Sequence, residues 1–265
     1  MNKKYKGAVF FDADGTLVDE RLGIYKATEK TQEAIIRLKQ NGYLTGFATG
    51  RAAFYLPDVG VDFDCIVVCN GALAKTNDEI IFCDYLVNSA LDEVIDYMYK
   101  NDYAYCFESH NKGYYNGKSI DSMFSMLNKF NIPTNLFEPC SDHHGIDIVK
   151  MMTFFEREEQ FEELKNRLKG EFIVGRHHSA YSADIIKPGI NKAVGIKATI
   201  EYFGIDIKDT YAFGDDTNDL EMLAEVGCGI AMTPHSPLLE AVADRYTGSV
   251  GEEGIYTALT ELGLI

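Results

Sequence analysis

Apolar and polar positions alternate near both ends of the chain in a way that predicts short strands separated by helices. Apolar and β-branched runs predict strands at 8–11, 43–48, 65–68, 211–213 and 229–232. Helical spacing of apolar residues predicts helices at 31–40, 193–202 and 219–224. Strands that recur with helices between them are typical of βαβ units, so both ends predict a parallel sheet with helices on both faces.

The middle of the chain follows another pattern. Between about residues 85 and 183 it is richer in Tyr, Asn and Met, and it predicts helices at 91–99, 122–130 and 159–168 with strands at 103–107, 146–154 and around Phe172 and Ser182. Such blocks favour a small α+β unit. We therefore predict an α/β protein with a Rossmann-like, doubly wound core over 1–84 and 185–265. An α+β domain over 85–184 interrupts it, with hinges near Tyr85–Asn88 and Ala183–Lys187.

Composition and charge narrow the possible partners. The 265 residues are 46% hydrophobic and 25% charged, which is typical of a globular protein. The net charge of −16 argues against nucleic acid or an anionic membrane as the main partner, whereas a small anion needs only a local group of donors. The six cysteines form no C-x-x-C pair, and no apolar stretch is long enough to span a membrane. We expect a reduced, cytoplasmic protein of undetermined oligomeric state.

Two carboxylates directly follow the first predicted strand. Residues 10–17 read F-F-D-A-D-G-T-L, so the strand delivers Asp12 and Asp14 into a turn at Gly15. Ligands of open α/β sheets bind at the carboxyl ends of the strands. Two neighbouring acids differ in proton affinity, which suits one as nucleophile or metal ligand and the other as general acid/base. Solvated carboxylates that cap the next segment are the alternative, but the whole motif favours catalysis.

The second predicted core strand ends on Thr49, Gly50 and Arg51. The threonine hydroxyl and the following backbone N–H groups can bind an oxyanion. A plain strand-to-turn junction with a surface arginine fits this short motif equally well.

An acidic cluster follows the 211–213 strand. Asp215, Asp216, Asn218 and Asp219 are oxygen donors of the kind that Mg²⁺ prefers. Helix capping by Asp216, Thr217 or Asn218 is the alternative, and both roles are compatible.

A lysine precedes the 193–202 helix in K-P-G-I-N-K, at Lys187 or Lys192. A lysine beside a helix N-terminus supplies positive charge for a phosphate, although an isolated lysine there is more often a surface residue.

Taken in order, D-x-D-G-T-L, the strand-end threonine, the later lysine and G-D-D-x-N-D resemble the four motifs of the haloacid-dehalogenase-like phosphatase superfamily. Only 37 positions separate Asp12 from Thr49, too few for a helical cap at the superfamily's first insertion point. The 143 positions between Thr49 and Lys192 leave room for an α+β cap at the second point. With Asn70-Gly71-Ala72 and G-I-N-K, this arrangement resembles the Cof-type sugar-phosphatase branch, and phosphomannomutases and sucrose- and trehalose-phosphate phosphatases share a related cap.

The resemblance implies a role for each motif residue. Asp12 would attack phosphorus and become an aspartyl-phosphate, and Asp14 would be the general acid/base. Mg²⁺ would be held by Asp12, the Asp14 carbonyl and Asp215, with Asp219 or Asn218 in support.

The resemblance also implies a phosphate site. Thr49 and Lys192 would bind the transferring phosphoryl group, and Gly50 and Asn218 belong to the same substrate-binding set. Lys192 is preferred over Lys187 because it follows the G-[VIL]-x pattern.

The implied function is Mg²⁺-dependent hydrolysis of small phosphorylated metabolites, with sugar phosphates favoured. A phosphomutase with the same cap is one alternative. A phospho-aspartate signalling module is another, although such modules are about half as long and lack an acid two residues after the phosphorylated aspartate.

Weaker features lie in the middle segment. The histidine pairs 143–144 and 177–178 suggest a metal site, but adjacent residues on a strand point to opposite faces, so we expect surface polar residues instead. Arg176 has the same two interpretations, substrate contact or surface. Four tyrosines could stack on a sugar or fill a small core, and the core is favoured: Tyr103, Tyr105, Tyr114 and Tyr115.

Overall fold

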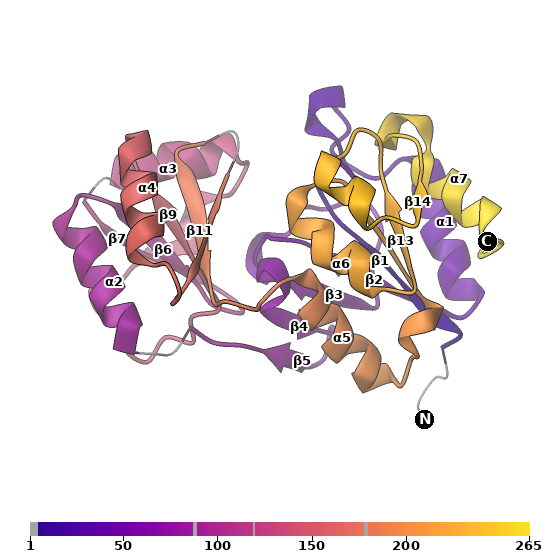
Figure 1. Cartoon of the computed structure of the whole chain (residues 1–265), viewed down its shortest axis with the longest axis horizontal. Coiled ribbons are helices and arrows are strands. Elements are labelled where there is room, and N and C mark those ends of the chain that lie inside the picture. The colour runs from indigo at the N-terminus through magenta and orange to yellow at the C-terminus, as the bar shows by residue number, and fades with distance from the viewer. Residues whose placement is uncertain (1–4, 87–88, 119, 178–179) are drawn as a thin grey trace. The chain divides into compact units, whose positions relative to one another are not determined.

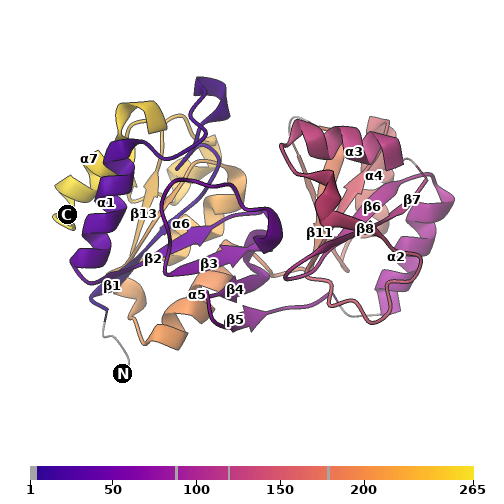
Figure 2. The same ribbon diagram turned by 180° about the vertical axis from the view of Figure 1, so that it is seen from behind.

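A computed structural model describes residues 5–86, 89–118, 120–177 and 180–265 and divides the chain into two units, each built on its own sheet (Figures 1 and 2). The core unit comprises residues 5–51, 57–83 and 191–265, and the inserted unit comprises residues 52–56 and 84–190. Of the positions singled out in the sequence, Asn88 and His178 lie outside the described residues.

The core unit contains an eight-stranded sheet in the order β14-β13-β12-β1-β2-β3-β4-β5. Its strands are β1 (Gly7–Phe11), β2 (Tyr43–Ala48), β3 (Cys65–Val68), β4 (Leu73–Lys75), β5 (Ile80–Cys83), β12 (Thr210–Gly214), β13 (Cys228–Ala231) and β14 (Arg245–Tyr246). The strands from β14 to β3 are parallel, whereas β4 and β5 add an antiparallel edge. The predicted α/β class is therefore confirmed, with this antiparallel extension added.

Two pairs of helices cover the core sheet: α1 (Glu29–Gln40) with α7 (Gly254–Glu261), and α5 (Lys192–Phe203) with α6 (Leu220–Glu225). Figures 1 and 2 show the two pairs on opposite faces of the sheet. On the α5 and α6 face, Ile196 and Met222 pack against Phe10. On the other face the rings of Phe11 and Phe213 stack at 5.3 Å. The apolar alternation of the strands thus buries both faces, as expected for a doubly wound sheet.

The chain order around β1 fixes where a ligand can bind. From β1 the sheet continues through β2 and β3 in one direction and through β12 and β13 in the other. In open α/β sheets, ligands bind outside the carboxyl ends of the strands at such a switch in strand order. The motif residues lie there because Asp12 directly follows β1, Thr49 follows β2 and Asp215 follows β12.

The inserted unit contains a six-stranded sheet in the order β10-β11-β9-β6-β7-β8, antiparallel except for the β7–β8 pair. Its strands are β6 (Ala104–Glu108), β7 (Gly113–Gly117), β8 (Phe137–Pro139), β9 (Lys150–Phe154), β10 (Ile173–Arg176) and β11 (Ser182–Ile186). Its helices are α2 (Ser89–Lys100), α3 (Ile120–Lys129) and α4 (Glu158–Arg167). Helices α2 and α4 bury Met98 and Leu164 against Tyr103 and Tyr105 of the sheet region, so these two tyrosines belong to the core.

A short segment of the chain, 52–56, belongs to the inserted unit although it follows β2. The Phe54 ring packs edge-on against Phe137 at 5.6 Å, and the Tyr55 hydroxyl donates to Glu108 Oε1 at 2.6 Å. These contacts explain why the segment falls outside the predicted division at 84/85 and 184/185: two aromatic side chains find partners far along the sequence. The strand predicted at 146–154 also begins later, at Lys150.

Candidate active site

The ends of β1 and β12 bring three carboxylates together. The two strands pair in parallel with Phe11 beside Phe213, and the Asp12 N–H donates to the Phe213 carbonyl at 3.0 Å. Asp215 is the first residue after β12, and Asp219 is the last residue of the 3-10 turn that follows. The ligand oxygens of Asp12, Asp215 and Asp219 all lie within 4.8 Å of one another.

Lys192 is the cation of this group. Its Nζ lies 2.5 Å from Asp12 Oδ1 and 2.6 Å from Asp219 Oδ1, and its side chain is completely buried. Lys192 is the first residue of α5, and Asn191 caps the helix by accepting from the Val194 N–H. A Cβ at Gly71 would lie 1.9 Å from the Asn191 carbonyl oxygen, so the glycine of Asn70-Gly71 is needed for α5 to begin this close to β3.

Burial and mutual repulsion shift the acid–base properties of the cluster. Burial and the Asp219 carboxylate raise the pKa of Asp12 to about 7, even though Lys192 acts in the opposite direction. Burial, together with Asp12 and Asp219, raises the pKa of Asp215 to about 9. Burial alone would lower the pKa of Lys192, but Asp12 and Asp219 raise it above its usual range. The lysine therefore stays charged, but its single positive charge does not balance the charges of the three neighbouring carboxylates.

The shape and donor set of the cluster fit a hard divalent cation. Asp215 Oδ1 is buried and has no hydrogen-bond partner. Gly15 lies directly against the same side chain, because a Cβ there would be 2.1 Å from Asp215 Oδ2, and its φ of +87° also favours glycine. Clustered carboxylate oxygens with one oxygen unsatisfied are the environment that Mg²⁺ prefers, so the residues present fit this ion.

Asp14 differs from Asp12 in its surroundings. Its side chain is 52% exposed and forms a bidentate pair with Arg51, with Arg51 Nη2 3.0 Å from Oδ1 and Nε 3.2 Å from Oδ2. Thr49 is buried, and its hydroxyl accepts from the Arg51 N–H at 3.2 Å. The structure thus joins the first two motifs through Arg51, for which the sequence had also allowed a plain surface position.

Asn70 is a site residue for which the sequence predicted no role. It follows β3 with a positive φ of 54°, and its Oδ1 accepts from Asn218 Nδ2 at 3.4 Å. A Cβ at Gly50 would lie 2.8 Å from the same oxygen. Asn70 therefore lies between Gly50 and Asn218. The Asn-Gly pair after an apolar strand was the available signal, because asparagine tolerates the left-handed conformation.

Asp216 caps a turn, and Lys187 forms an ion pair within the inserted unit. The Asp216 side chain accepts from the Thr217 N–H at 2.7 Å and caps the 3-10 turn, so helix capping coexists with the acidic cluster. Lys187 Nζ lies 2.5 Å from Asp84 Oδ1 within the inserted unit. Of the two lysines considered, the structure brings Lys192 to Asp12.

The inserted unit holds a buried ionic network that the sequence pattern did not predict. Lys150 Nζ lies 3.1 Å from Glu108 Oε2 and 2.9 Å from Asp184 Oδ1. Although burial raises the proton affinity of Asp184, Lys150 and His177 hold its pKa well below the usual range. The signal was weak because each residue lies on a different strand, and the pairing of β6, β9 and β11 brings them together.

Two further residues of the inserted unit that the sequence singled out, Arg176 and Tyr115, have local partners. Arg176 lies over the Phe155 ring at 4.8 Å and pairs with Glu158 at 2.9 Å. Tyr115 packs edge-on against Phe124. His143 and His144 precede β9 in a turn and not on a strand, so the argument from opposite strand faces does not apply to this pair.

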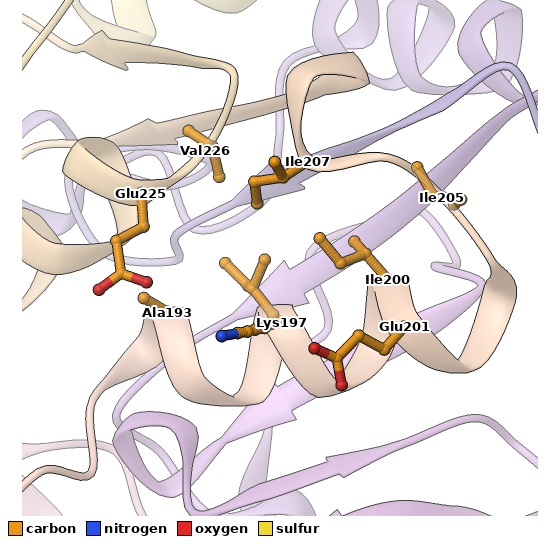
Figure 3. A pocket seen from close by; sticks show the side chains of 9 residues that line it. Ala193, Lys197, Ile200, Glu201, Ile205, Ile207, Glu225 and Val226 are labelled. Carbon is orange, nitrogen blue, oxygen red and sulfur yellow. The ribbon is translucent and has the colours of Figure 1, made fainter.

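A separate pocket of about 380 Å³ lies beside α5 and α6 (Figure 3). Ile196, Ile200 and Ile205 line it, with Lys197 and Glu225 among the polar neighbours. None of the motif side chains lines this pocket. It is therefore distinct from the acidic cluster.

The fold defines a Rossmann-like α/β enzyme core with an α+β insertion, and the family profile described as haloacid dehalogenase-like hydrolase matches residues 9–259. The chain belongs to this family, and it is a phosphatase. Among its relatives, YkrA of Bacillus subtilis, whose name assigns it as a phosphatase, is 30% identical over 97% of this chain and 98% of its own. The 5-amino-6-(5-phospho-D-ribitylamino)uracil phosphatase YitU of Bacillus subtilis is 27% identical over 96% of each chain.

A solved structure has the same fold. A hypothetical protein from Geobacillus kaustophilus superposes with a TM-score of 0.84 at 32% identity, covering 98% of this chain and 99% of the other. In the part of the chain that the structure describes, no helix has the length and apolar character needed to cross a membrane. None of the six cysteines, all of which lie in the described residues, forms a disulfide bond.

Proposed function

We propose that this phosphatase hydrolyses phosphomonoesters of small metabolites with Mg²⁺ and through an aspartyl-phosphate on Asp12. The observation that carries the proposal is the contact of Lys192 with Asp12, 2.5 Å, beside the unsatisfied Asp215 oxygen. A buried carboxylate with a cation on one side and a metal-binding cluster on the other is suited to meet an anionic phosphate. Mg²⁺ would be held by Asp12, the Asp14 carbonyl, Asp215 and Asp219, and it would reduce the repulsion between carboxylate and phosphate.

Two displacements at phosphorus complete the reaction. An Asp12 oxygen forms a bond to phosphorus while the bond to the leaving oxygen breaks, and Asp14 donates a proton to that oxygen. A water then attacks phosphorus, Asp14 removes its proton, and the bond to Asp12 breaks to release phosphate. The Asp14 side chain is 52% exposed, so water can reach it.

The phosphoryl oxygens would be bound by Lys192, the Thr49 hydroxyl and the backbone of Gly50. Asn218 would contribute through the amide that now donates to Asn70. These groups stabilise the charge that spreads over the phosphoryl oxygens during transfer.

We propose that the inserted unit, 52–56 and 84–190, is the substrate-selecting cap and that the core unit carries the chemistry, in place of the predicted division at 84/85 and 184/185. The Lys187–Asp84 pair lies where the chain enters and leaves this insertion, and we place the hinges there. Phosphorylated sugars or sugar alcohols are the proposed substrates, a choice supported by the phosphoribityl compound named for YitU. We further propose a reducing, cytoplasmic location, because six cysteines without a disulfide bond are typical of such a compartment.

The test is release of inorganic phosphate from a panel of sugar phosphates, nucleotides, phosphorylated cofactors and an aryl phosphate. We expect turnover that needs Mg²⁺ and falls at least about 10³-fold in Asp12→Asn. Asp216→Asn is the matched control, because it changes a neighbouring exposed carboxyl that caps a turn. Full activity of Asp12→Asn would exclude the nucleophile, and transfer of phosphate back to the sugar without release would indicate a mutase.

A further inference from the structure

Three side chains that can bind a metal lie close together on the surface of the inserted unit. They share no residue with the acidic cluster. His143 Nε2 lies 2.8 Å and His144 Nε2 lies 3.6 Å from the same oxygen, Asp92 Oδ1. The ligand atoms of all three residues lie within 4.8 Å of one another. Asp92 is in the first turn of α2, so the contact joins this helix to the turn that precedes β9.

A fourth residue holds one of the imidazoles in position. Asp142 Oδ1 lies 2.6 Å from His144 Nδ1 and also accepts from the His144 N–H at 3.0 Å. With Nδ1 engaged by a carboxylate, the ring presents Nε2 toward Asp92. Carboxylates commonly orient metal-binding histidines in this way and fix the tautomer that leaves the other nitrogen free.

Exposure gives an ion access to the three ligands. The Asp92 and His144 side chains are 54% and 70% exposed, whereas His143 is 16% exposed and its ring lies 4.5 Å from that of His144. The two imidazoles therefore share one side of the turn. An ion at this point would replace the His143–Asp92 hydrogen bond with bonds to all three residues.

We propose that Asp92, His143 and His144 form a binding site for a borderline divalent transition metal, with Zn²⁺ as the ion tested. Two imidazole nitrogens and one carboxylate suit zinc, whereas Mg²⁺ prefers oxygen ligands. Three protein ligands leave a position for water, and the bound ion links α2 to the 140–145 turn. The proposal is independent of the phosphatase mechanism, because it concerns other residues and another class of metal.

The experiment uses the full chain after dialysis against EDTA, in the Asp215→Asn background so that the acidic cluster contributes little. Zinc is titrated calorimetrically in excess Mg²⁺, and the histidine side-chain nitrogens are followed by NMR. We expect one equivalent of Zn²⁺ to bind, with shifts of the His143 and His144 Nε2 signals but not of His235. The double variant His143→Gln/His144→Gln should lower the affinity at least about 10-fold.

Cys140→Ser is the matched control, because this thiol lies in the same turn and donates to the Asp142 carbonyl instead of facing Asp92. It should bind zinc like the parent chain. Unchanged histidine signals in the presence of zinc, or zinc binding that survives the double variant, would overturn the site and leave a hydrogen-bonded surface cluster. The NMR result on the parent chain decides the question even if the double variant folds poorly.

Discussion

Asp215→Asn should make the metal-free protein more stable, although it removes a residue that we assign to metal binding. Its carboxyl has a pKa raised from 3.8 to about 9, and its Oδ1 has no hydrogen-bond partner. Near neutral pH the folded state must therefore bind a proton that the unfolded state releases. Asparagine has nearly the same shape and carries no charge in either state, so the substitution removes this penalty.

The magnitude follows from proton linkage. Roughly three pH units separate the unfolded pKa from pH 7, and about 1.4 kcal/mol per unit gives a ceiling of about 4 kcal/mol. The side chain is only partly buried, and solvent screening reduces the penalty, so we expect about 2 kcal/mol. In a chain of this size that corresponds to an increase in Tm of about 4–8 °C.

The sign of the pH dependence is also fixed. Below about pH 4 the wild-type carboxyl is protonated in both states, so the variant and the wild type should have nearly equal stability. The advantage of the variant should grow as the pH rises toward about 9, the folded pKa, and then level off. Mg²⁺ should stabilise the wild type by mass action and have little effect on Asp215→Asn.

The assay is thermal unfolding followed by circular dichroism after dialysis against EDTA, at several pH values, with and without Mg²⁺. Asp216→Asn is the control, since its side chain is exposed and caps a turn, and it contributes less to the raised pKa of Asp215 than burial, Asp12 or Asp219 does. A variant that is less stable than the wild type near pH 8 without metal would refute the reasoning about the buried charge.

Two further predictions concern other contacts. Lys192→Met should lower kcat/KM at least about 10²-fold, because a donor to the phosphoryl group is lost, whereas Lys187→Met should change it only a few-fold; equal losses in a phosphate-release assay would contradict the assignment of Lys192. Tyr55→Phe should lower the free energy of unfolding by about 1–2 kcal/mol, because Glu108 loses a buried hydrogen bond, and an unchanged urea midpoint for the full chain would show that the bond contributes nothing.

The core could be predicted from sequence because its elements carry strong local signals. The strands at 43–48 and 65–68 have the predicted bounds, since each is a largely apolar run that leads into a turn, at Thr49-Gly50 and at Asn70-Gly71. The short strands β4 and β14 were not predicted because each has three residues or fewer and no clear alternation. Such strands are defined by the neighbour with which they pair and not by their own pattern.

The candidate site could be predicted where its functional residues lie in short contiguous motifs of the sequence. The positions of Asp12 and Asp215 follow from strand ends that meet at one edge of the sheet, and Lys192 joins them from the start of helix α5. Contacts between distant residues could not be predicted in the same way. The hydrogen bond of Tyr55 with Glu108 and the approach of Asp92 to His143 depend on how loops pack, which periodicity does not record.

The central claim is that the Asp12 carboxylate accepts the phosphoryl group. The most direct measurement is to quench the enzyme during turnover of an aryl phosphate, reduce it with borohydride and map its peptides by mass spectrometry. The account predicts that an acyl phosphate reduced to the alcohol is found at Asp12, depends on substrate and is missing in Asp12→Asn. Reduction at another aspartate, or turnover with no reducible acyl phosphate under conditions that slow its hydrolysis, would contradict it.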